Sequence, residues 1–132
     1  MPDMTSIRTN KSILAVDDEH DIVNLIKLSL DMNGFKVCTF TDALAALGHF
    51  KSHSSYYDIV ISDIRMPGMN GYEFIKHVKN INPKVKVVLM SAFEINKKEF
   101  HNLLPDIKVD AFLQKPFHIQ QINDVVQKIS RD

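Results

Sequence analysis

The sequence predicts a doubly wound α/β domain in which five parallel strands alternate with five helices. Short apolar runs rich in β-branched residues alternate with longer segments whose apolar residues recur at helical spacing. Such runs are typical of strands that are buried on both faces of a parallel sheet and joined by crossover helices. The expected strands are Ile13–Val16, Phe35–Phe40, Ile59–Ile61, Val85–Met90 and Ala111–Leu113.

A helical pattern follows each predicted strand. In four of these segments the apolar side chains repeat at steps near 3.6 residues; they are Ile22, Val23, Ile26 and Leu30, then Leu44, Leu47 and Phe50, then Phe74, Ile75 and Val78, and finally Ile119, Ile122, Val125, Val126 and Ile129. Thr41 is the predicted N-cap of the second helix. The segment Glu94–Leu104 is less clearly periodic, and we predict a helix there as well. Turn residues separate the elements at Asn33-Gly34, Pro67-Gly68, Asn70-Gly71 and Asn82-Pro83.

The length and composition are those of one soluble globular domain. The 132 residues are 45% hydrophobic and 24% charged, and the 16 basic and 16 acidic side chains give a net charge of zero. A balanced charge argues against direct binding of nucleic acid through a basic surface. The balance conceals an asymmetry, because residues 1–66 carry 6 basic and 9 acidic groups while residues 67–132 carry 10 and 7. We predict a domain over residues 11–130, preceded by a polar tail over residues 1–10.

The cysteine content and the lengths of the apolar runs favour the cytoplasm. Cys38 is the one cysteine of the sequence, which excludes an intramolecular disulfide framework and favours a buried structural thiol. No apolar run approaches the ~18 residues that would cross a bilayer. The polar N-terminal residues do not form the hydrophobic segment of a signal peptide. We therefore expect a cytoplasmic protein that does not bind a membrane.

Polar side chains that suit a functional site follow four of the five predicted strands, at the edge where sites of doubly wound folds lie. Asp17 and Asp18 follow the first strand, Asp63 the third, Ser91 the fourth and Lys115 the fifth. Carboxylates that meet at one edge repel, by about 4 kcal/mol for two charges 4 Å apart at an effective dielectric constant of 20. Mg²⁺ would relieve this repulsion. A Mg²⁺ ion, a lysine and a hydroxyl group around a carboxylate can together bind and transfer a phosphoryl group, and Asp63 is the candidate nucleophile.

Each of these features has an ordinary structural interpretation when taken alone. A pair of aspartates after a strand more often caps a helix than binds a metal. Ser91 also suits a helix cap, and Lys115-Pro116 suits a loop. Their joint occurrence after four strands, in the order that one site requires, favours the functional interpretation.

The same residues resemble the receiver domain of two-component response regulators, in its single-domain, chemotaxis-regulator-like form. The resemblance is carried by Asp17-Asp18 after ILAV, Asp63 in DIVISDIRMPGMNGYEF, Ser91-Ala92 after VVLM, and Lys115-Pro116-Phe117 after AFLQ. It covers residues 11–130. It implies a flavodoxin-like (βα)5 sandwich whose parallel sheet has the strand order 2-1-3-4-5.

The resemblance also implies how the acidic residues divide their roles. Asp63 matches the acceptor of a phosphoryl group from the phosphohistidine of a sensor histidine kinase. Asp18 matches the direct Mg²⁺ ligand, and Asp17 its acidic companion, which acts mainly through metal-bound water. Arg65 matches the position whose backbone carbonyl completes the metal shell.

Four further positions match the family's phosphoryl-binding and switching residues. Lys115 matches the lysine that pairs with the phosphoryl group, and Pro116 matches the proline of a cis peptide bond. Ser91 matches the hydroxyl residue that moves toward a phosphoryl oxygen. Phe112 matches the aromatic residue that swings inward as Ser91 moves.

The implied function is a phosphorylation-controlled binding module that is not an enzyme and has no output domain of its own. We expect it to be a monomer or a weak dimer. The expected partners are a sensor histidine kinase and a downstream effector, bound on the face formed by Glu94–Leu104, Ala111–Leu113 and the last helix. A close alternative is an intermediate carrier that passes the phosphoryl group to a histidine phosphotransfer protein.

A rival from another class is a Mg²⁺-dependent phosphohydrolase with Asp63 as its nucleophile. Such enzymes often place an acidic general acid two residues after the nucleophile, where this chain has Arg65. We expect Arg65 and Phe93, which flank the acceptor, to restrict attack by water and lengthen the lifetime of the phosphoryl group. His49 and His53 have the i, i+4 spacing of a metal-binding pair, but without an apparent third ligand we expect an ordinary surface pair.

Overall fold

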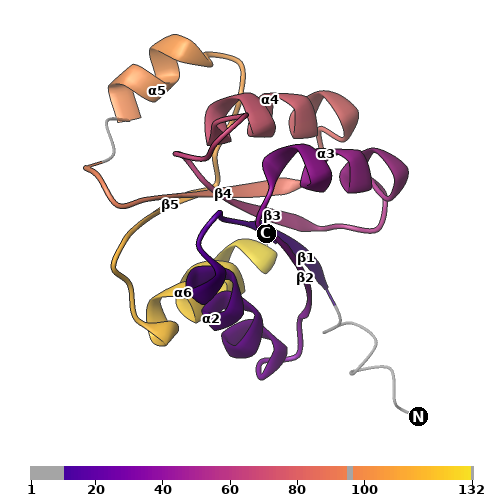
Figure 1. The fold of residues 1–132 in the computed structure, drawn as a ribbon, viewed down its shortest axis with the longest axis vertical. Coiled ribbons are helices and arrows are strands. Elements are labelled where there is room, and N and C mark those ends of the chain that lie inside the picture. The colour runs from indigo at the N-terminus through magenta and orange to yellow at the C-terminus, as the bar shows by residue number, and fades with distance from the viewer. Residues whose placement is uncertain (1–10, 95–96, 132) are drawn as a thin grey trace.

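The computed structural model describes residues 11–94 and 97–131, apart from the side chain of residue 99. Strands and helices alternate along the chain in the order β1 (Ser12–Val16), α2 (His20–Asp31), β2 (Lys36–Phe40), α3 (Ala43–Ser52), β3 (Ile59–Asp63), α4 (Gly71–Ile81), β4 (Lys86–Ser91), α5 (Lys97–Leu103), β5 (Ala111–Gln114) and α6 (Ile119–Ser130). All neighbouring strands pair in parallel, in the order β2-β1-β3-β4-β5 (Figure 1). The predicted fold class and strand order are confirmed.

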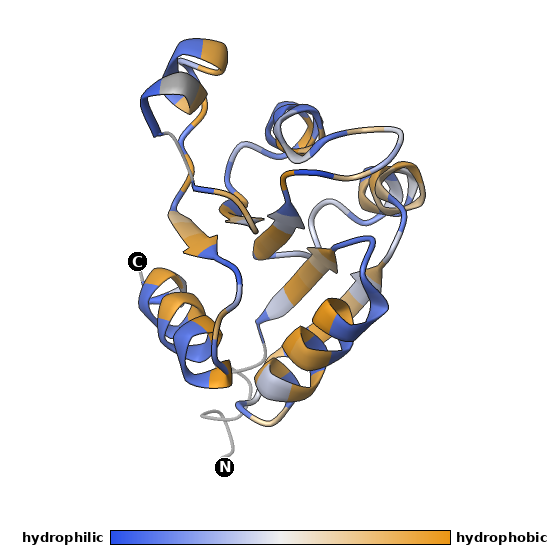
Figure 2. Ribbon diagram, turned by 60° about the vertical axis from the view of Figure 1, so that its left-hand side comes forward, coloured by the Kyte–Doolittle hydropathy of each residue, from blue (hydrophilic) through white to orange (hydrophobic). Residues whose placement is uncertain are grey.

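The helices cover the sheet on both faces. In Figure 1, α2 and α6 lie on one side of the sheet and α3 and α4 on the other, with α5 farther out beyond β4. Alternate residues of β1 point to opposite layers, so that Leu14 and Val16 belong to the core on the α3 and α4 side, whereas Ile13 and Ala15 belong to the other. Figure 2 shows hydrophobic residues along the strands and on the inner sides of the helices.

Burial explains why the sequence forms these strands. Every residue of β1 and of β3 is buried, which is why both are nearly continuous apolar runs. Burying a side chain such as Leu14 or Ile61 contributes roughly 1.5–3 kcal/mol relative to leaving it exposed. The edge strands β2 and β5 are more exposed, and Cys38 on β2 is accordingly only partly buried, not fully buried as predicted.

The structure corrects the predicted start of the second helix. Asp42 is the N-cap of α3, where Thr41 was predicted: its backbone is extended and its side chain accepts a hydrogen bond from the Leu44 backbone N–H at 3.4 Å. The predicted helix Glu94–Leu104 is observed as α5, and residues 95–96 lie outside the described residues. The predicted tail, residues 1–10, also lies outside them. Among the described residues, no helix is both long and apolar enough to cross a membrane.

Candidate functional site

Three aspartates converge at the carboxyl ends of the two central strands. Asp17 and Asp18 follow β1 directly, and Asp63 is the last residue of β3. Each offers a carboxylate oxygen that lies within 4.8 Å of the oxygens of the other two. Asp17 and Asp63 are 0% and 5% exposed, whereas Asp18 faces solvent. The adjacency of β1 and β3 in the sheet therefore brings residues 46 positions apart into one cluster.

Lys115 supplies a positive charge among these carboxylates. Its Nζ lies 2.6 Å from Asp17 Oδ2, 3.3 Å from Asp63 Oδ1 and 3.2 Å from Glu19 Oε1, and the residue is 8% exposed. The Lys115 backbone N–H donates to the Ser91 carbonyl at 2.7 Å, which extends the β5 pairing with β4 by one step. The Lys115–Pro116 peptide bond that follows is cis.

The electrostatics of the cluster are dominated by burial. Burial, reinforced by the charge of Asp17, raises the pKa of Asp63 from its ordinary value of 3.8 to about 6, although Lys115 opposes the shift. Burial also raises the pKa of Asp17, against the hydrogen bonds from Lys115 and from the Glu19 backbone N–H. Burial alone would lower the pKa of Lys115, but its contacts with Asp17, Asp63 and Glu19 outweigh that effect and raise it.

The residues fit a hard divalent cation. Three carboxylate oxygens within 4.8 Å form the oxygen-rich, negatively charged donor set that Mg²⁺ prefers. Asp17 Oδ2 is buried and, within the part of the chain that the structure describes, accepts no hydrogen bond apart from its ion pair with Lys115. One lysine does not balance three carboxylates, so a further cation would relieve the remaining repulsion.

A cavity of about 220 Å³ opens above Asp63. Its lining consists of Asp18, Glu19, Asp63, Arg65, Ser91, Ala92, Phe93 and Lys115. Ser91 ends β4 and is 5% exposed, and its Oγ accepts a hydrogen bond from the Phe93 backbone N–H at 3.0 Å. The Arg65 guanidinium lies 4.2 Å from the centre of the Phe93 ring, a cation–π contact at the cavity wall.

Phe112 lies on β5 and packs toward α5. Its ring meets Phe100 edge-on with centroids 5.6 Å apart, and Lys97 Nζ lies 5.5 Å from the Phe112 centroid. Phe100 in turn contacts Tyr72 at the start of α4, with ring centroids 5.6 Å apart. Phe112 therefore connects β5 to α5 and is separate from the residues that line the cavity.

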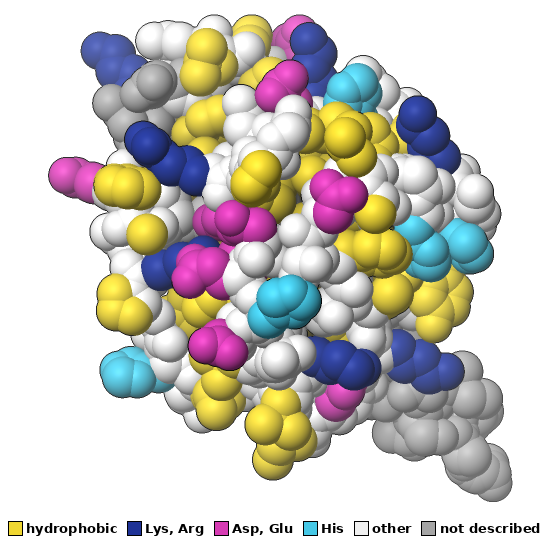
Figure 3. Space-filling view, in the orientation of Figure 1, with side chains coloured by type: hydrophobic (Ala, Val, Ile, Leu, Met, Phe, Trp, Pro, Cys, Tyr) yellow, Lys and Arg dark blue, Asp and Glu magenta, His cyan; other side chains and the backbone are white. Residues whose placement is uncertain are grey.

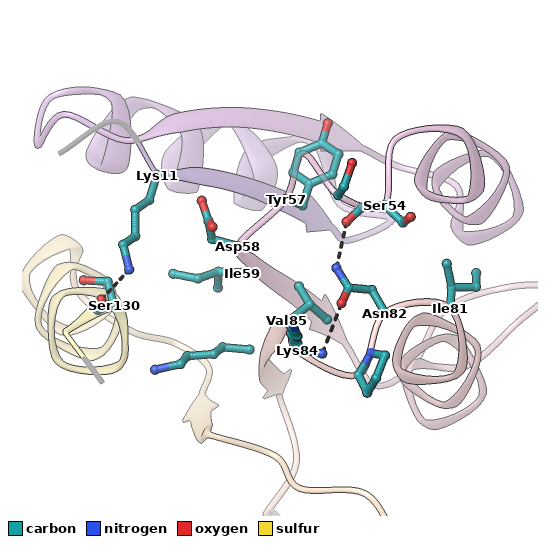
Figure 4. A pocket seen from close by; sticks show the side chains of 13 residues that line it. Lys11, Ser54, Tyr57, Asp58, Ile59, Ile81, Asn82, Lys84, Val85 and Ser130 are labelled. Atoms are coloured by element: carbon teal, nitrogen blue, oxygen red, sulfur yellow. Dashed lines mark hydrogen bonds between the residues drawn. The ribbon is translucent and has the colours of Figure 1, made fainter. Parts of the chain in front are cut away.

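A larger cavity, of about 580 Å³, lies at the opposite, amino ends of the strands. Figure 4 shows that Lys11 points to Ser130 at the end of α6 and that Asn82 connects Ser54 with Lys84. In these contacts of 2.6–3.1 Å, the side chains of Lys11 and Asn82 donate to the Ser130 and Ser54 backbone carbonyls, and Asn82 Oδ1 accepts from the Lys84 backbone N–H. The cavity thus holds structural hydrogen bonds, and the reactive groups gather in the smaller one.

The histidine pair at the end of α3, His49 within the helix and His53 as its C-cap, belongs to no group of three possible cation ligands among the described residues. The rings of His49 and His53 stack with centroids 4.2 Å apart, and His49 Nε2 is hydrogen-bonded to Tyr57 Oη at 2.7 Å. Among the described residues, Asp17, Asp18 and Asp63 form the one group of three His, Cys, Asp or Glu ligand atoms close enough to share an ion.

Sequence reasoning gave no role to Glu19, although its carboxylate reaches Lys115. One signal was available: Glu19 immediately precedes a helix, at a position where Ser, Thr, Asp or Asn is favoured. The stacking of Arg65 on Phe93 could not be derived from the sequence, because it depends on side-chain conformation.

The chain matches a known protein family over most of its length. Residues 13–127 match the model of the response regulator receiver domain. The chain belongs to this family of receiver domains. Its members are the signalling domains of two-component response regulators, which bind Mg²⁺ at an acidic pocket and work with histidine kinases and with effectors or phosphotransfer proteins.

Individual relatives agree with this assignment. The alkaline phosphatase synthesis transcriptional regulatory protein PhoP of Bacillus subtilis is 30% identical over 123 residues, which are 92% of this chain and 49% of PhoP. The sporulation initiation phosphotransferase F of the same species is 29% identical over 119 residues, 90% of this chain and 93% of that protein. The receiver chain thus spans about half of the length of PhoP and 43% of that of the response regulator GtcR of Aneurinibacillus migulanus.

Solved structures agree as well. The response regulator TrrA of Thermotoga maritima, in complex with Mg²⁺ and BeF, is 31% identical, with a TM-score of 0.75 over 90% of this chain and 98% of TrrA. The chemotaxis protein CheY4 of Vibrio cholerae is 26% identical, with a TM-score of 0.79 over 91% of this chain and 98% of CheY4.

Proposed function

We propose that this receiver domain accepts a phosphoryl group on Asp63 from the phosphohistidine of a sensor histidine kinase, in a Mg²⁺-dependent reaction in the cytoplasm. The observation that carries the proposal is the position of Asp63. Its side chain lines a cavity and offers carboxylate oxygens that lie 3.3 Å from the Lys115 ammonium and within 4.8 Å of carboxylate oxygens of Asp17 and Asp18.

The proposed step is an in-line displacement at phosphorus. An Asp63 carboxylate oxygen forms the new bond to phosphorus as the bond between phosphorus and the histidine nitrogen breaks, and the departing imidazole takes up a proton. Lys115 would donate to one phosphoryl oxygen and Ser91 to another. Asp17, Asp18, Asp63 and the Arg65 carbonyl would hold Mg²⁺, which neutralises charge on the transferring group when bound.

The test is treatment with Mg²⁺ and acetyl phosphate, or with beryllofluoride. We expect a modification that maps to Asp63, requires Mg²⁺ and is absent from Asp63→Asn. Asp58→Asn is a matched control, because Asp58 is an exposed aspartate at the opposite end of β3 that lines the other cavity. No modification of the wild-type protein, or an undiminished one in Asp63→Asn, would refute the proposal.

We further propose that phosphorylation changes partner binding on the face formed by α5, β5 and α6. The contact of Phe112 with Phe100 supports this, since inward movement of Phe112 would withdraw the ring against which α5 packs. The domain would then act as a non-enzymatic switch, as a monomer or weak dimer that controls an effector protein. Ser91→Ala should accept the phosphoryl group but lose the change in the Phe100 and Phe112 aromatic resonances.

The second candidate function is an intermediate carrier in a phosphorelay. The likeness to the sporulation initiation phosphotransferase F, which is 29% identical over 90% of this chain and is named as a phosphotransferase, favours it. Transfer of label from phosphorylated Asp63 to a histidine phosphotransfer protein would support the relay, and its absence with every candidate acceptor would favour the effector switch. A phosphohydrolase is disfavoured, because Arg65 stacks on Phe93 where that reaction would need an acid.

We also propose that Arg65 and Phe93 shield the phosphoryl group from water. Their contact at 4.2 Å covers one wall of the cavity, and the Phe93 ring adds apolar surface beside the site. The variant Arg65→Ala, Phe93→Ala should lose the phosphoryl group several-fold faster than wild type. An unchanged or slower loss would contradict this role.

A further inference from the structure

We propose that Glu19 is a positioning residue that holds the Lys115 ammonium in the resting domain and thereby weakens the site for dianionic phosphoryl donors. This inference rests on the proposed function of Asp63 as phosphoacceptor. Glu19 would compete with the incoming phosphoryl group for the Lys115 ammonium.

The geometry around Lys115 Nζ is the first support. Three carboxylates share this ammonium, from Asp17 at 2.6 Å, Glu19 at 3.2 Å and Asp63 at 3.3 Å. Glu19 differs from the other two because its side chain is 63% exposed while that of Lys115 is 8% exposed. Its carboxylate therefore lies on the solvent side of a buried ammonium and lines the cavity through which a donor must enter.

The backbone around Glu19 is the second support. Glu19 is the N-cap residue of α2, but its side chain makes no capping hydrogen bond. Its backbone N–H donates to Asp17 Oδ1 at 3.0 Å, which fixes the residue beside the site. A side chain that served the helix would be a short one, such as Ser or Asp. The glutamate reaches across to Lys115 instead, 96 positions away in the sequence.

Competition follows from charge. A phosphoryl group brings a charge of about −1.5 to −2 and several acceptor oxygens into the cavity. Lys115 has three N–H donors, all within reach of carboxylates in the resting state, so a new acceptor must replace one of them. The solvent-exposed pair with Glu19 is the one most readily broken. The Glu19 carboxylate then loses its partner and repels the incoming group.

The expected size of the effect is modest and measurable. An exposed ion pair contributes little, and its loss together with the repulsion of one nearby charge corresponds to about a three- to tenfold change in an equilibrium constant. Glu19→Gln keeps the length of the side chain and removes its charge. We therefore expect the acetyl phosphate concentration that gives half-maximal phosphorylation of Asp63 to fall about three- to tenfold in this variant.

Asp21→Asn is the matched control. Asp21 lies in the first turn of the same helix and is exposed, so the variant has the same change in net charge, but Asp21 does not line the cavity. We expect less than about a twofold change for it. A measurement on the metal-free protein distinguishes the direct ion pair with Lys115 from a general effect of the lost negative charge. Exchange of the Lys115 Nζ protons with water, followed by NMR, should accelerate in Glu19→Gln and not in Asp21→Asn.

Three outcomes bear on the inference. The expected pattern supports it. Equal effects of Glu19→Gln and Asp21→Asn, or no effect of either on a normally phosphorylated protein, overturn it and leave the proposed function standing. Wild-type protein that is not modified at Asp63 overturns the proposed function itself, before the variants are compared.

Discussion

The raised pKa of Asp63 leads to a prediction about stability that is independent of any phosphodonor. Asp63 is 5% exposed, and burial together with the charge of Asp17 raises its pKa to about 6. In the unfolded chain the pKa returns to an ordinary value near 3.8. The native state therefore binds this proton more tightly than the unfolded state does. The contribution of Asp63 to the free energy of unfolding therefore falls as the pH rises from about 4 to about 6, and it is constant at higher pH.

The magnitude follows from the two pKa values. A difference of about two pKa units corresponds to roughly 3 kcal/mol of destabilisation by the ionised Asp63 at pH 7.5. At pH 4.5 the native carboxyl group is mostly protonated, and Asp63 destabilises the domain by only about 1 kcal/mol. Asp63→Asn replaces the carboxylate with a neutral group of the same shape. In the absence of metal it should stabilise the domain by on the order of 3 kcal/mol at pH 7.5 and by about 2 kcal/mol less at pH 4.5.

Urea unfolding of wild type and Asp63→Asn in EDTA, at pH 4.5 and pH 7.5, measures this difference directly. Mg²⁺ should act in the opposite direction, since a concentration ten times the dissociation constant stabilises the binding-competent protein by about 1.4 kcal/mol. Wild type should gain this stabilisation, and Asp63→Asn, which lacks one carboxylate, should gain less. A stability difference that is the same at both pH values would refute the electrostatic reasoning, whatever its size.

Three further substitutions test the scaffold of the domain. Gly71→Ala would place a Cβ against the Asp63 carbonyl oxygen and 2.8 Å from Ile64 Cα, so urea unfolding should show a loss of about 1–3 kcal/mol, with slower labelling of Asp63 by acetyl phosphate. Asn70→Ala removes the capping box of α4, in which Glu73 N–H donates to Asn70 Oδ1 at 2.9 Å, and should lower the free energy of unfolding by about 1 kcal/mol. Ser29→Ala removes a buried hydroxyl that has no hydrogen-bond partner among the described residues. The free energy of unfolding should therefore stay unchanged or rise by on the order of 1 kcal/mol, which a thermal melt would show as an unchanged or higher midpoint.

The fold could be predicted because its signals are redundant. β1 and β3 are buried along their whole length, so their apolar runs identify both the strands and the parallel, two-sided sheet. The errors lie at ends and edges. Asp42 and Thr41 are both good N-cap residues, and only the backbone conformation selects Asp42. Cys38 lies in an apolar run, but its strand is at the edge of the sheet, where one side is open.

The site was predictable where it depends on backbone topology. Asp17 and Lys115 follow β1 and β5 directly, and Asp63 and Ser91 are the last residues of β3 and β4. Parallel strands bring their carboxyl ends to one edge of the sheet, whatever their side chains are. What could not be predicted depends on side-chain reach. Glu19 meets Lys115 at 3.2 Å because both side chains are long enough to bring their charged ends together.

The net charge of zero conceals an imbalance at the functional site. The acidic excess of the first half of the chain includes Asp17, Asp18, Glu19 and Asp63, and one lysine from the second half lies among them. On the face shown in Figure 3, several acidic side chains lie close together left of centre, with basic side chains around them. Four carboxylates against one ammonium repel whatever the charge of the whole chain. Mg²⁺ reduces this repulsion, whereas a phosphoryl group adds negative charge and acceptor oxygens that compete for the same lysine. Each ligand thus changes what Lys115 can contact. The Lys115 backbone N–H is hydrogen-bonded to the Ser91 carbonyl at the ends of β4 and β5, the two strands that α5 connects, so a change at the ammonium occurs next to both ends of that connection.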